Sequence, residues 1–385
     1  MKPGIAIEAY LFAMFDENNK TVQGDDPTER RFGLFTPDKM SKYLFLAFLS
    51  LVALLHPLSC KSSMAAILLL IGLLHITGVQ SIGVCYGRLG NNLPSVAETI
   101  TLYKNNGIEG LRIYDASTEV FDALKGTNIG VIVDVPNDKL QDLANPDKAN
   151  DWVRKNIVPY PDVNFKYVAV GNEVYPGKTG SDYALAALKN VHAELLAAGK
   201  GGIKASTATY SYVFDKTYPP ENGVFKDEAK NLMEPIVQFL AQNNLPLLAN
   251  IYPYFGRTSA PLSFSLFTDT QLNPVGYQNM FDSMLDSMYA AVEKAGGSNV
   301  PIVVSESGWP SDGGPDASPE NAATYYRNLI QHVKGNPGTP KKPGIAIETY
   351  LFAMFDENEK NGDATEQHFG LFNPDQSPKY QLSFN

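Results

Sequence analysis

The sequence predicts a single (β/α)8 TIM barrel from residue 81 to residue 385, and three observations carry this prediction. Strand-like apolar stretches alternate with stretches of helical periodicity throughout this part of the chain, as βα units around a parallel sheet require. Eight such strands follow one another, the number that closes this type of barrel. The fourth and the seventh each end in an acid, Glu173 and Glu306, where such barrels place catalytic residues.

The predicted strands are short runs rich in β-branched and apolar residues. In the fourth, Val168 to Gly171 forms an apolar run closed by glycine, which is typical of a buried parallel strand. No linker interrupts the alternation, so we expect one catalytic domain. The strands are expected at residues 81–86, 110–115, 128–134, 167–171, 203–209, 247–254, 301–306 and 344–355, and helices at 95–105 (with Ser95 as cap), 182–198, 227–242, 277–295 and 319–333.

Residues 1–39 nearly repeat the end of the chain. Residues 2–18 match 342–358, and the match resumes at 32–35 and 369–372 with three extra residues in the first copy. Two copies are too few for a solenoid. We interpret this atypical extension as the tail of a related neighbouring gene, joined to the front by a faulty gene model. The alternative is a real extension that docks on, or competes for, the last barrel strand. Neither interpretation gives it a catalytic role.

Residues 40–80 have the character of a secretory signal. They contain two apolar runs, 43–55 and 64–74, each shorter than the about 20 residues that a membrane span needs. Translation from Met40 or Met64 would give an ordinary signal peptide cleaved near residues 78–80. With Met1 as the start, the signal would be internal and could act as an anchor. We expect secretion and no stable membrane anchor.

Composition excludes several classes of function. The formal net charge of −10 argues against a nucleic-acid or anionic-membrane partner, whereas a neutral polymer remains compatible. Cys60 and Cys85 are the two cysteines, and neither forms a zinc-type spacing with histidine. The glycines of residues 87–94 do not form a phosphate-binding pattern. We therefore predict neither a metal nor a cofactor.

The two strand-end acids suggest a chemistry. Glycoside hydrolysis uses a pair of carboxyl groups, one as acid/base and the other as nucleophile or base. Either Glu173 or Glu306 alone would more often be a solvated loop acid; their placement after matched apolar strands favours catalysis. A serine hydrolase is rejected because the mature chain has no Gly-x-Ser-x-Gly elbow.

Six ordered motifs make the chain recognisable. They lie at residues 82–87, 111–115, 170–174, 250–255, 304–311 and 348–358, and together they resemble the plant endo-β-1,3-glucanases of glycoside hydrolase family 17. The resemblance covers residues 82–384. It implies a retaining endo-hydrolase of β-1,3-glucan with Glu173 as acid/base and Glu306 as nucleophile. It also implies that Glu357, Lys360 and Glu366 are supporting charged residues near the cleft, although a surface ion pair is the alternative for Glu357 and Lys360.

Other residues are expected to contact the substrate. Asn172, next to the acid/base, should hydrogen-bond the sugar 2-OH. Tyr114 and Tyr252 end their strands on the catalytic face, and Tyr252 is placed to hydrogen-bond the nucleophile. Aromatic residues that could line the cleft, each about as often core as ligand-facing, are Tyr86, Tyr254, Phe255 and Trp309.

The remaining expectations concern biology and rival functions. The predicted partner is a β-glucan polysaccharide and the predicted state a monomer. The resemblance implies a secreted enzyme of the cell wall or apoplast, with the vacuole as alternative, acting in plant defence or cell-wall turnover. Within the same chemistry, the alternative is a β-1,3-1,4-glucanase on mixed-linkage glucan. From another class, the alternative is a non-catalytic glucan-binding barrel impaired by the front extension.

Overall fold

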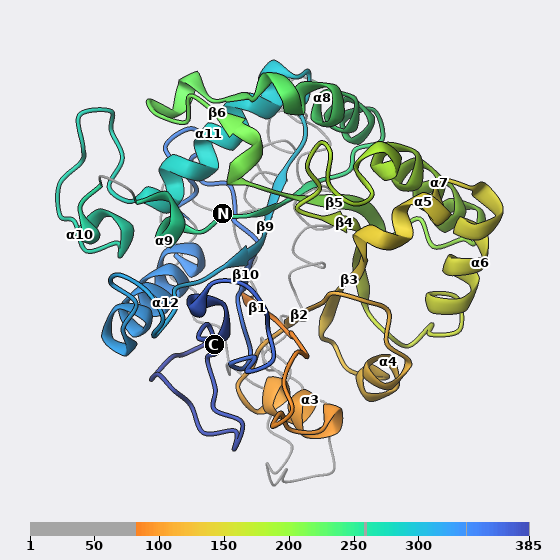
Figure 1. Ribbon diagram of the computed structural model, residues 1–385, viewed down its shortest axis with the longest axis horizontal. Helices are drawn as coiled ribbons and strands as arrows, with labels where there is room; N and C mark the ends of the chain where they lie inside the picture. Colours follow the sequence, from red (N-terminus) through yellow and green to blue (C-terminus); the bar gives the residue numbers. More distant parts are fainter. Residues whose placement is uncertain (1–81, 258–259, 336, 385) are drawn as a thin grey trace, which may run out of the picture. The chain divides into compact units, whose positions relative to one another are not determined.

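The structure, a computed structural model, describes residues 82–257, 260–335 and 337–384. In these residues eight parallel strands close a barrel in the order β1-β10-β9-β8-β5-β4-β3-β2, with helices around the outside (Figure 1). The predicted (β/α)8 barrel is confirmed. The barrel strands are β1 (Ile82–Cys85), β2 (Gly110–Ile113), β3 (Gly130–Val135), β4 (Phe165–Asn172), β5 (Lys204–Tyr210), β8 (Leu247–Asn250), β9 (Ile302–Ser307) and β10 (Thr349–Leu351).

The helices follow the strands, and several begin at caps that the sequence supplies. Ser95 and Glu98 form a reciprocal capping box at the start of α3, as the predicted cap at Ser95 requires. The α-helices are α3 (Val96–Asn105), α4 (Thr118–Leu124), α5 (Leu140–Leu143), α6 (Pro146–Asn156), α7 (Ala184–Ala197), α8 (Asp227–Gln242), α9 (Pro253–Gly256), α10 (Leu262–Ser265), α11 (Met280–Lys294) and α12 (Pro319–Lys334). The 3-10 turns are η2 (Asn137–Lys139), η3 (Ser181–Tyr183), η4 (Ser211–Val213), η5 (Pro220–Asn222) and η6 (Ala364–Gln367).

Several element boundaries differ from the predictions: the sixth strand, expected at 247–254, ends at Asn250, and helix α9 begins at Pro253. Helix α11 begins at Met280 rather than residue 277, because the side chain of Asn279 accepts the Asp282 N–H and caps the helix there. The eighth strand is shorter than predicted, because the chain after Leu351 pairs with the C-terminal tail. The N–H of Ala353, for example, donates to the carbonyl of Phe369 at 2.9 Å. An apolar run does not by itself reveal which partner will pair with it.

Residues 214–225 add a short antiparallel ribbon that the sequence did not predict. Strands β6 (Phe214–Asp215) and β7 (Val224–Phe225) pair beside the barrel, and the N–H of Lys226 then donates to the carbonyl of Val213 at 2.9 Å. This bond joins the chain after β7 to η4, the turn that follows β5. The ribbon thereby fixes the rim of the barrel on the β5 side.

The apolar core has an outer layer and an inner layer. The outer layer lies between strands and helices, and the inner one fills the barrel with residues such as Ile132, Leu248 and Val303. The barrel is therefore packed, and the space for a ligand lies above it at the C-terminal ends of the strands. No helix within the described residues is both long and apolar enough to span a bilayer. The predicted duplicate at 1–39 and signal segment at 40–80 lie outside the described residues.

Candidate active site

The acid of the fourth strand lies in a sharp turn of the backbone. Strand β4 ends at Asn172, and Glu173 adopts a positive φ of 52°. Its N–H still donates to the carbonyl of Ala208 on β5, at 2.8 Å. Two residues earlier Gly171 has a φ of 86°, and a Cβ there would lie 2.7 Å from Val174. Left-handed backbone at a non-glycine residue costs about 1–3 kcal/mol and is concentrated at functional sites.

The acid of the seventh strand is held by three donors. Glu306 lies on β9, 5% exposed, in register with Asn250 on β8. Tyr114 donates to its Oε1 at 2.9 Å and Tyr252 to its Oε2 at 2.7 Å. Arg112 donates a third bond from Nη1 at 2.9 Å. The carboxylate is thus oriented as an acceptor, and the predicted contact of Tyr252 is present.

A buried polar network links the two acids. Arg112 on β2 is fully buried and forms a bidentate pair with Asp134 on β3, at 3.1 and 2.6 Å. Its Nη2 also donates to Asn172 at 2.9 Å, and its Nη1 to Asn250 at 3.0 Å. Asn250 in turn donates to Glu173 at 2.8 Å. One guanidinium therefore connects the strand ends that carry Glu173 and Glu306.

Sequence reasoning missed Arg112, Asp134 and Asn250 as site residues. The signal was present, since Arg112 and Asp134 are charged residues inside apolar strands and Asn250 opens a family-like motif. A charge in a buried strand is costly unless it is paired. Its presence predicts a partner across the barrel, although the spacing in sequence does not say which one.

The electrostatics differ between the two acids. Burial raises the pKa of Glu173 to about 7, and the neighbouring negative charge of Glu306 adds to this effect. The hydrogen bond from Asn250 and the charge of Arg112 act in the opposite direction. Glu173 therefore keeps its proton near neutral pH, as a general acid must. Burial also raises the pKa of Asp134 to about 6, although Arg112 opposes the shift.

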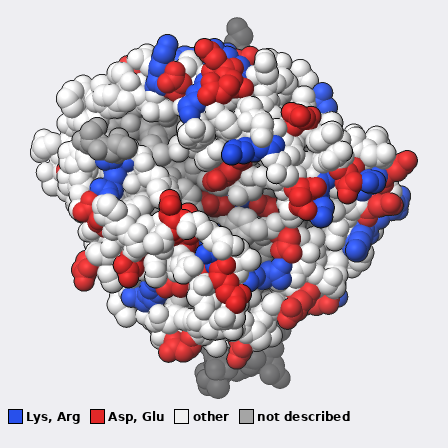
Figure 2. All heavy atoms as spheres, in the orientation of Figure 1, with Lys and Arg blue, Asp and Glu red and all other residues white. Residues whose placement is uncertain are grey.

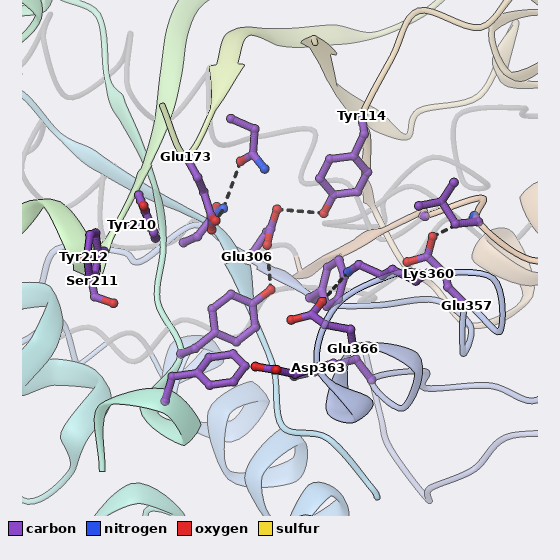
Figure 3. Close-up of a pocket in the computed structure, with 18 of the residues that line it drawn as sticks. Tyr114, Glu173, Tyr210, Ser211, Tyr212, Glu306, Glu357, Lys360, Asp363 and Glu366 are labelled. Carbon is purple, nitrogen blue, oxygen red and sulfur yellow. Dashed lines mark hydrogen bonds and ion pairs between the residues drawn. The ribbon is translucent and has the colours of Figure 1, made fainter. Parts of the chain in front are cut away.

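Both acids lie in one cavity. It has a volume of about 1260 Å³, and Figure 2 shows acidic side chains gathered in the hollow of this face. Glu173 and Glu306 lie beside each other in its middle, with Tyr114 bonded to Glu306 (Figure 3). Of the residues predicted to contact the substrate, those that line the cavity are Tyr86, Tyr114, Asn172, Tyr252, Phe255, Glu357, Lys360 and Glu366.

The predicted supporting charges lie on one side of the two acids (Figure 3). Lys360 and Glu366 form an ion pair at 2.8 Å, and the Lys360 ammonium lies 4.2 Å from the ring centroid of Phe352. Glu357 accepts the N–H of Leu89 at 2.9 Å, and burial raises its pKa. Glu357 and Lys360 do not pair with each other at the surface, because each has another partner inside the cavity.

Two aromatic residues do not lie where the sequence suggested. Trp309 is fully buried and does not line the cavity. Its ring packs against Tyr254 and Tyr325 at centroid distances of 5.1 and 5.5 Å, and its Nε1 donates to the carbonyl of Asp316 at 3.0 Å. Tyr254 is likewise buried. Both belong to the core, because the chain turns away from the cavity after the strand ends that precede them.

The donor set does not indicate a metal centre. Within the described residues, no three or more His, Cys, Asp or Glu side chains are grouped so as to hold a metal ion. The acidic groups of the cavity are instead matched by guanidinium, ammonium and hydroxyl donors of the chain itself. Such an arrangement suits the binding and protonation of a neutral, hydroxyl-rich ligand.

Comparison with known proteins agrees with this geometry. The family model of glycosyl hydrolases family 17 matches residues 1–46 and 82–384. The chain is 59% identical to the glucan endo-1,3-beta-glucosidase acidic isoform GI9 of Nicotiana tabacum, over 84% of this chain and 97% of that protein.

Solved structures give the same result. One belongs to a study of two plant beta-glucan endohydrolases with distinct substrate specificities; it is 46% identical, with a TM-score of 0.75, over 78% of this chain and 99% of that one. Another is CJP38, a beta-1,3-glucanase and allergen of Cryptomeria japonica pollen. It is 45% identical, with a TM-score of 0.77, over 80% of this chain and 99% of that one. The resemblance stated from the motifs is thereby confirmed, and this chain belongs to the glycosyl hydrolases of family 17.

Proposed function

We propose that this glycoside hydrolase cleaves internal β-1,3-glucosidic bonds of β-glucans with retention of configuration, using Glu173 as acid/base and Glu306 as nucleophile. One observation carries the assignment of roles. Two carboxyl groups meet in the same cavity, and their surroundings differ: burial raises the pKa of Glu173 to about 7, whereas Glu306 accepts three hydrogen bonds. The names of the similar proteins support the substrate class.

In the first step, Glu173 gives its proton to the glycosidic oxygen as the bond from that oxygen to the anomeric carbon breaks. An oxygen of Glu306 forms the new bond to the anomeric carbon, so a glycosyl ester on Glu306 results and the leaving saccharide carries the proton. Tyr114 and Tyr252 hold the two oxygens of Glu306 in place before this attack. Positioning of this kind lowers the barrier by removing the need for reorientation.

In the second step, Glu173 acts as the base. Its carboxylate takes a proton from water, the hydroxide oxygen bonds to the anomeric carbon, and the ester bond to Glu306 breaks. Two inversions give net retention. Asn172 supports both steps: its Oδ1 accepts from Arg112 and Asn250, which leaves its amide N–H groups to donate to the sugar 2-OH.

The decisive experiment compares substrates with the purified protein. Hydrolysis of a pure β-1,3-glucan, with a rapid fall in viscosity and release of β-anomeric products seen by NMR, is the expected result. Faster hydrolysis of a mixed-linkage glucan would instead favour a β-1,3-1,4-glucanase. Binding of either polymer without turnover would favour the non-catalytic barrel and would overturn the assignment of Glu173 and Glu306.

We also propose that the protein is secreted and acts as a monomer at the cell wall. The apolar runs at 43–55 and 64–74 support secretion. N-terminal sequencing of the natural protein should give a first residue near 81. A first residue before 40 would show instead that the duplicate segment is retained. Light scattering of the purified protein tests the monomer.

A further inference from the structure

The rim of the cavity beside Glu173 carries two tyrosines that the proposed chemistry does not use. Tyr210 is the last residue of β5, and Tyr212 lies in the turn η4 that follows. Both line the cavity. Their ring planes are near parallel, at 27°, with centroids 5.9 Å apart. Tyr212 is 55% exposed, so its ring is open to a ligand in the cavity.

These tyrosines lie on the acid/base side of the cavity. Strand β5 pairs with β4, in register at Ala208 and Asn172. Figure 3 places Tyr210, Ser211 and Tyr212 beyond Glu173, and Glu357, Lys360, Asp363 and Glu366 on the far side of Glu306. After burial, the charge of Glu173 is the next cause that raises the pKa of Tyr210. Tyr210 therefore belongs to the part of the cavity that holds the acid/base.

The rings are held in place by neighbouring side chains. Tyr175 packs against Tyr212 with centroids 5.0 Å apart, and its hydroxyl is fixed by Glu228 at 2.9 Å. The Lys226 ammonium lies 3.5 Å from the ring centroid of Tyr212, at the position where the β6–β7 ribbon returns to the barrel. Tyr212 therefore has a defined orientation despite its exposure.

The chemistry of this cluster matches a sugar. Pyranose rings present C–H faces that pack on aromatic rings, and hydroxyl groups that accept hydrogen bonds. Lys226 also lines the cavity, and its ammonium contacts the ring of Tyr212 there. An ammonium group carries three N–H donors, which can meet hydroxyl groups of a ligand that packs beside Tyr212.

The acid/base defines which part of the substrate reaches this rim. The nucleophile attacks the anomeric carbon from the face opposite the leaving oxygen, and the acid protonates that oxygen. The direction from Glu306 to Glu173 therefore points toward the leaving saccharide. We propose that Tyr210, Tyr212 and Lys226 form a binding surface for the sugar residues on the leaving-group side of the glucan chain. This inference rests on the proposed function.

The test is the cleavage pattern of a β-1,3-linked glucohexaose labelled with ¹⁸O at its reducing end. The labelled fragment comes from the leaving-group side, and mass spectrometry gives its length. Tyr212→Ala should shift the labelled products to shorter fragments and lower kcat/KM about tenfold, the effect of losing one ring contact. Lys226→Ala should shift the pattern in the same direction. Tyr212→Phe, which keeps the ring, should shift it less than Tyr212→Ala.

A matched control is Tyr183→Ala. Tyr183 is also exposed, at 37%, but it lies in η3 and does not line the cavity. This variant should keep the wild-type pattern. Unchanged or longer labelled fragments for Tyr212→Ala, in a wild-type background that cleaves the hexaose, would overturn the inference and leave the proposed function standing. A wild-type protein that cleaves no bond of the hexaose would overturn both.

Discussion

The Nδ2 of Asn250 donates a hydrogen bond of 2.8 Å to Oε1 of Glu173, the residue proposed as acid/base. The orientation of this amide is fixed from its other end, because its Oδ1 accepts from Arg112 at 3.0 Å and from the Ser305 hydroxyl at 2.8 Å. A donor aimed at a carboxyl group stabilises the charged form. Asn250 thus limits how far burial and Glu306 can raise the pKa of Glu173.

The first prediction concerns the alkaline limb of the pH profile of kcat/KM. With a Glu173 pKa of about 7, the protonated fraction falls as pH rises through 7, so kcat/KM should fall there. Asn250→Ala removes a donor that favours the carboxylate, and the limb should move to higher pH. Initial rates on a β-1,3-glucan from pH 4 to 9 measure both curves. A limb that stays in place or moves to lower pH would show that Asn250 does not act on this proton.

The second prediction changes the other neighbour. Glu306→Gln keeps the shape of the side chain and removes its negative charge, which is the second cause of the raised pKa of Glu173. The pKa of Glu173 should therefore fall toward the ordinary value for glutamate. Titration of ¹³C-labelled carboxyl groups by NMR measures it without turnover. Asn250→Ala in the same assay should shift the pKa of Glu173 upward. If both variants shifted this pKa in the same direction, the described network would be contradicted.

Much of this site follows from the sequence, because strand ends in a parallel barrel converge on one face. Glu173 and Glu306 are 133 residues apart, yet each follows an apolar run, and barrel closure alone brings them together. Tyr114 and Tyr252 are predictable for the same reason. The position of Trp309 is not predictable in this way, since a side chain three residues beyond Glu306 can point into the cavity or away from it. Its direction depends on packing against Tyr254 and Tyr325.

Other parts of the site could not be predicted because they depend on pairings distant in sequence. The partner of Arg112 could have been any acid in the barrel, and closure places both Asp134 and Glu306 against it. The Tyr210–Tyr212 rim likewise depends on the β6–β7 ribbon, whose two-residue strands carry too little pattern to be recognised.

The third prediction tests the nucleophile. The substrate is an aryl β-glycoside of a β-1,3-linked glucose disaccharide, and Glu306→Ala should lower its turnover more than about 1000-fold. Added azide fits the vacated space, attacks from the same face and should give an α-glycosyl azide, identified by its anomeric coupling in NMR. In the matched variant Glu173→Ala, azide replaces water in the second step and should give the β-glycosyl azide. The same anomer from both variants would refute the assignment of roles.

The fourth prediction concerns Arg112. Arg112→Met leaves Asp134 buried without its partner and should lower the free energy of unfolding by about 3–5 kcal/mol, measured by urea denaturation. Lys230→Met breaks the exposed pair with Asp227, formed at 2.6 Å, and should leave the free energy of unfolding nearly unchanged, because solvent screens such a pair. The double variant Arg112→Met/Asp134→Leu should regain stability without regaining activity, because Glu306 still lacks the charged hydrogen bond from Arg112. Recovery of activity would show that Arg112 serves stability alone.

The fifth prediction separates a core aromatic from a cavity aromatic. Trp309 is fully buried and Phe255 is 47% exposed at the cavity. Trp309→Phe leaves a void and removes one of the two donors to the Asp316 carbonyl, where Asn321 still donates, and it should lower the free energy of unfolding by about 2 kcal/mol with KM for a β-1,3-glucan unchanged. Phe255→Ala should raise KM about three- to tenfold, the value of one aromatic contact, with a smaller loss of stability. If the Trp309→Phe variant is fully folded and its KM is nevertheless raised, the indole of Trp309 must lie in the cleft. A core side chain affects substrate binding only through the fold.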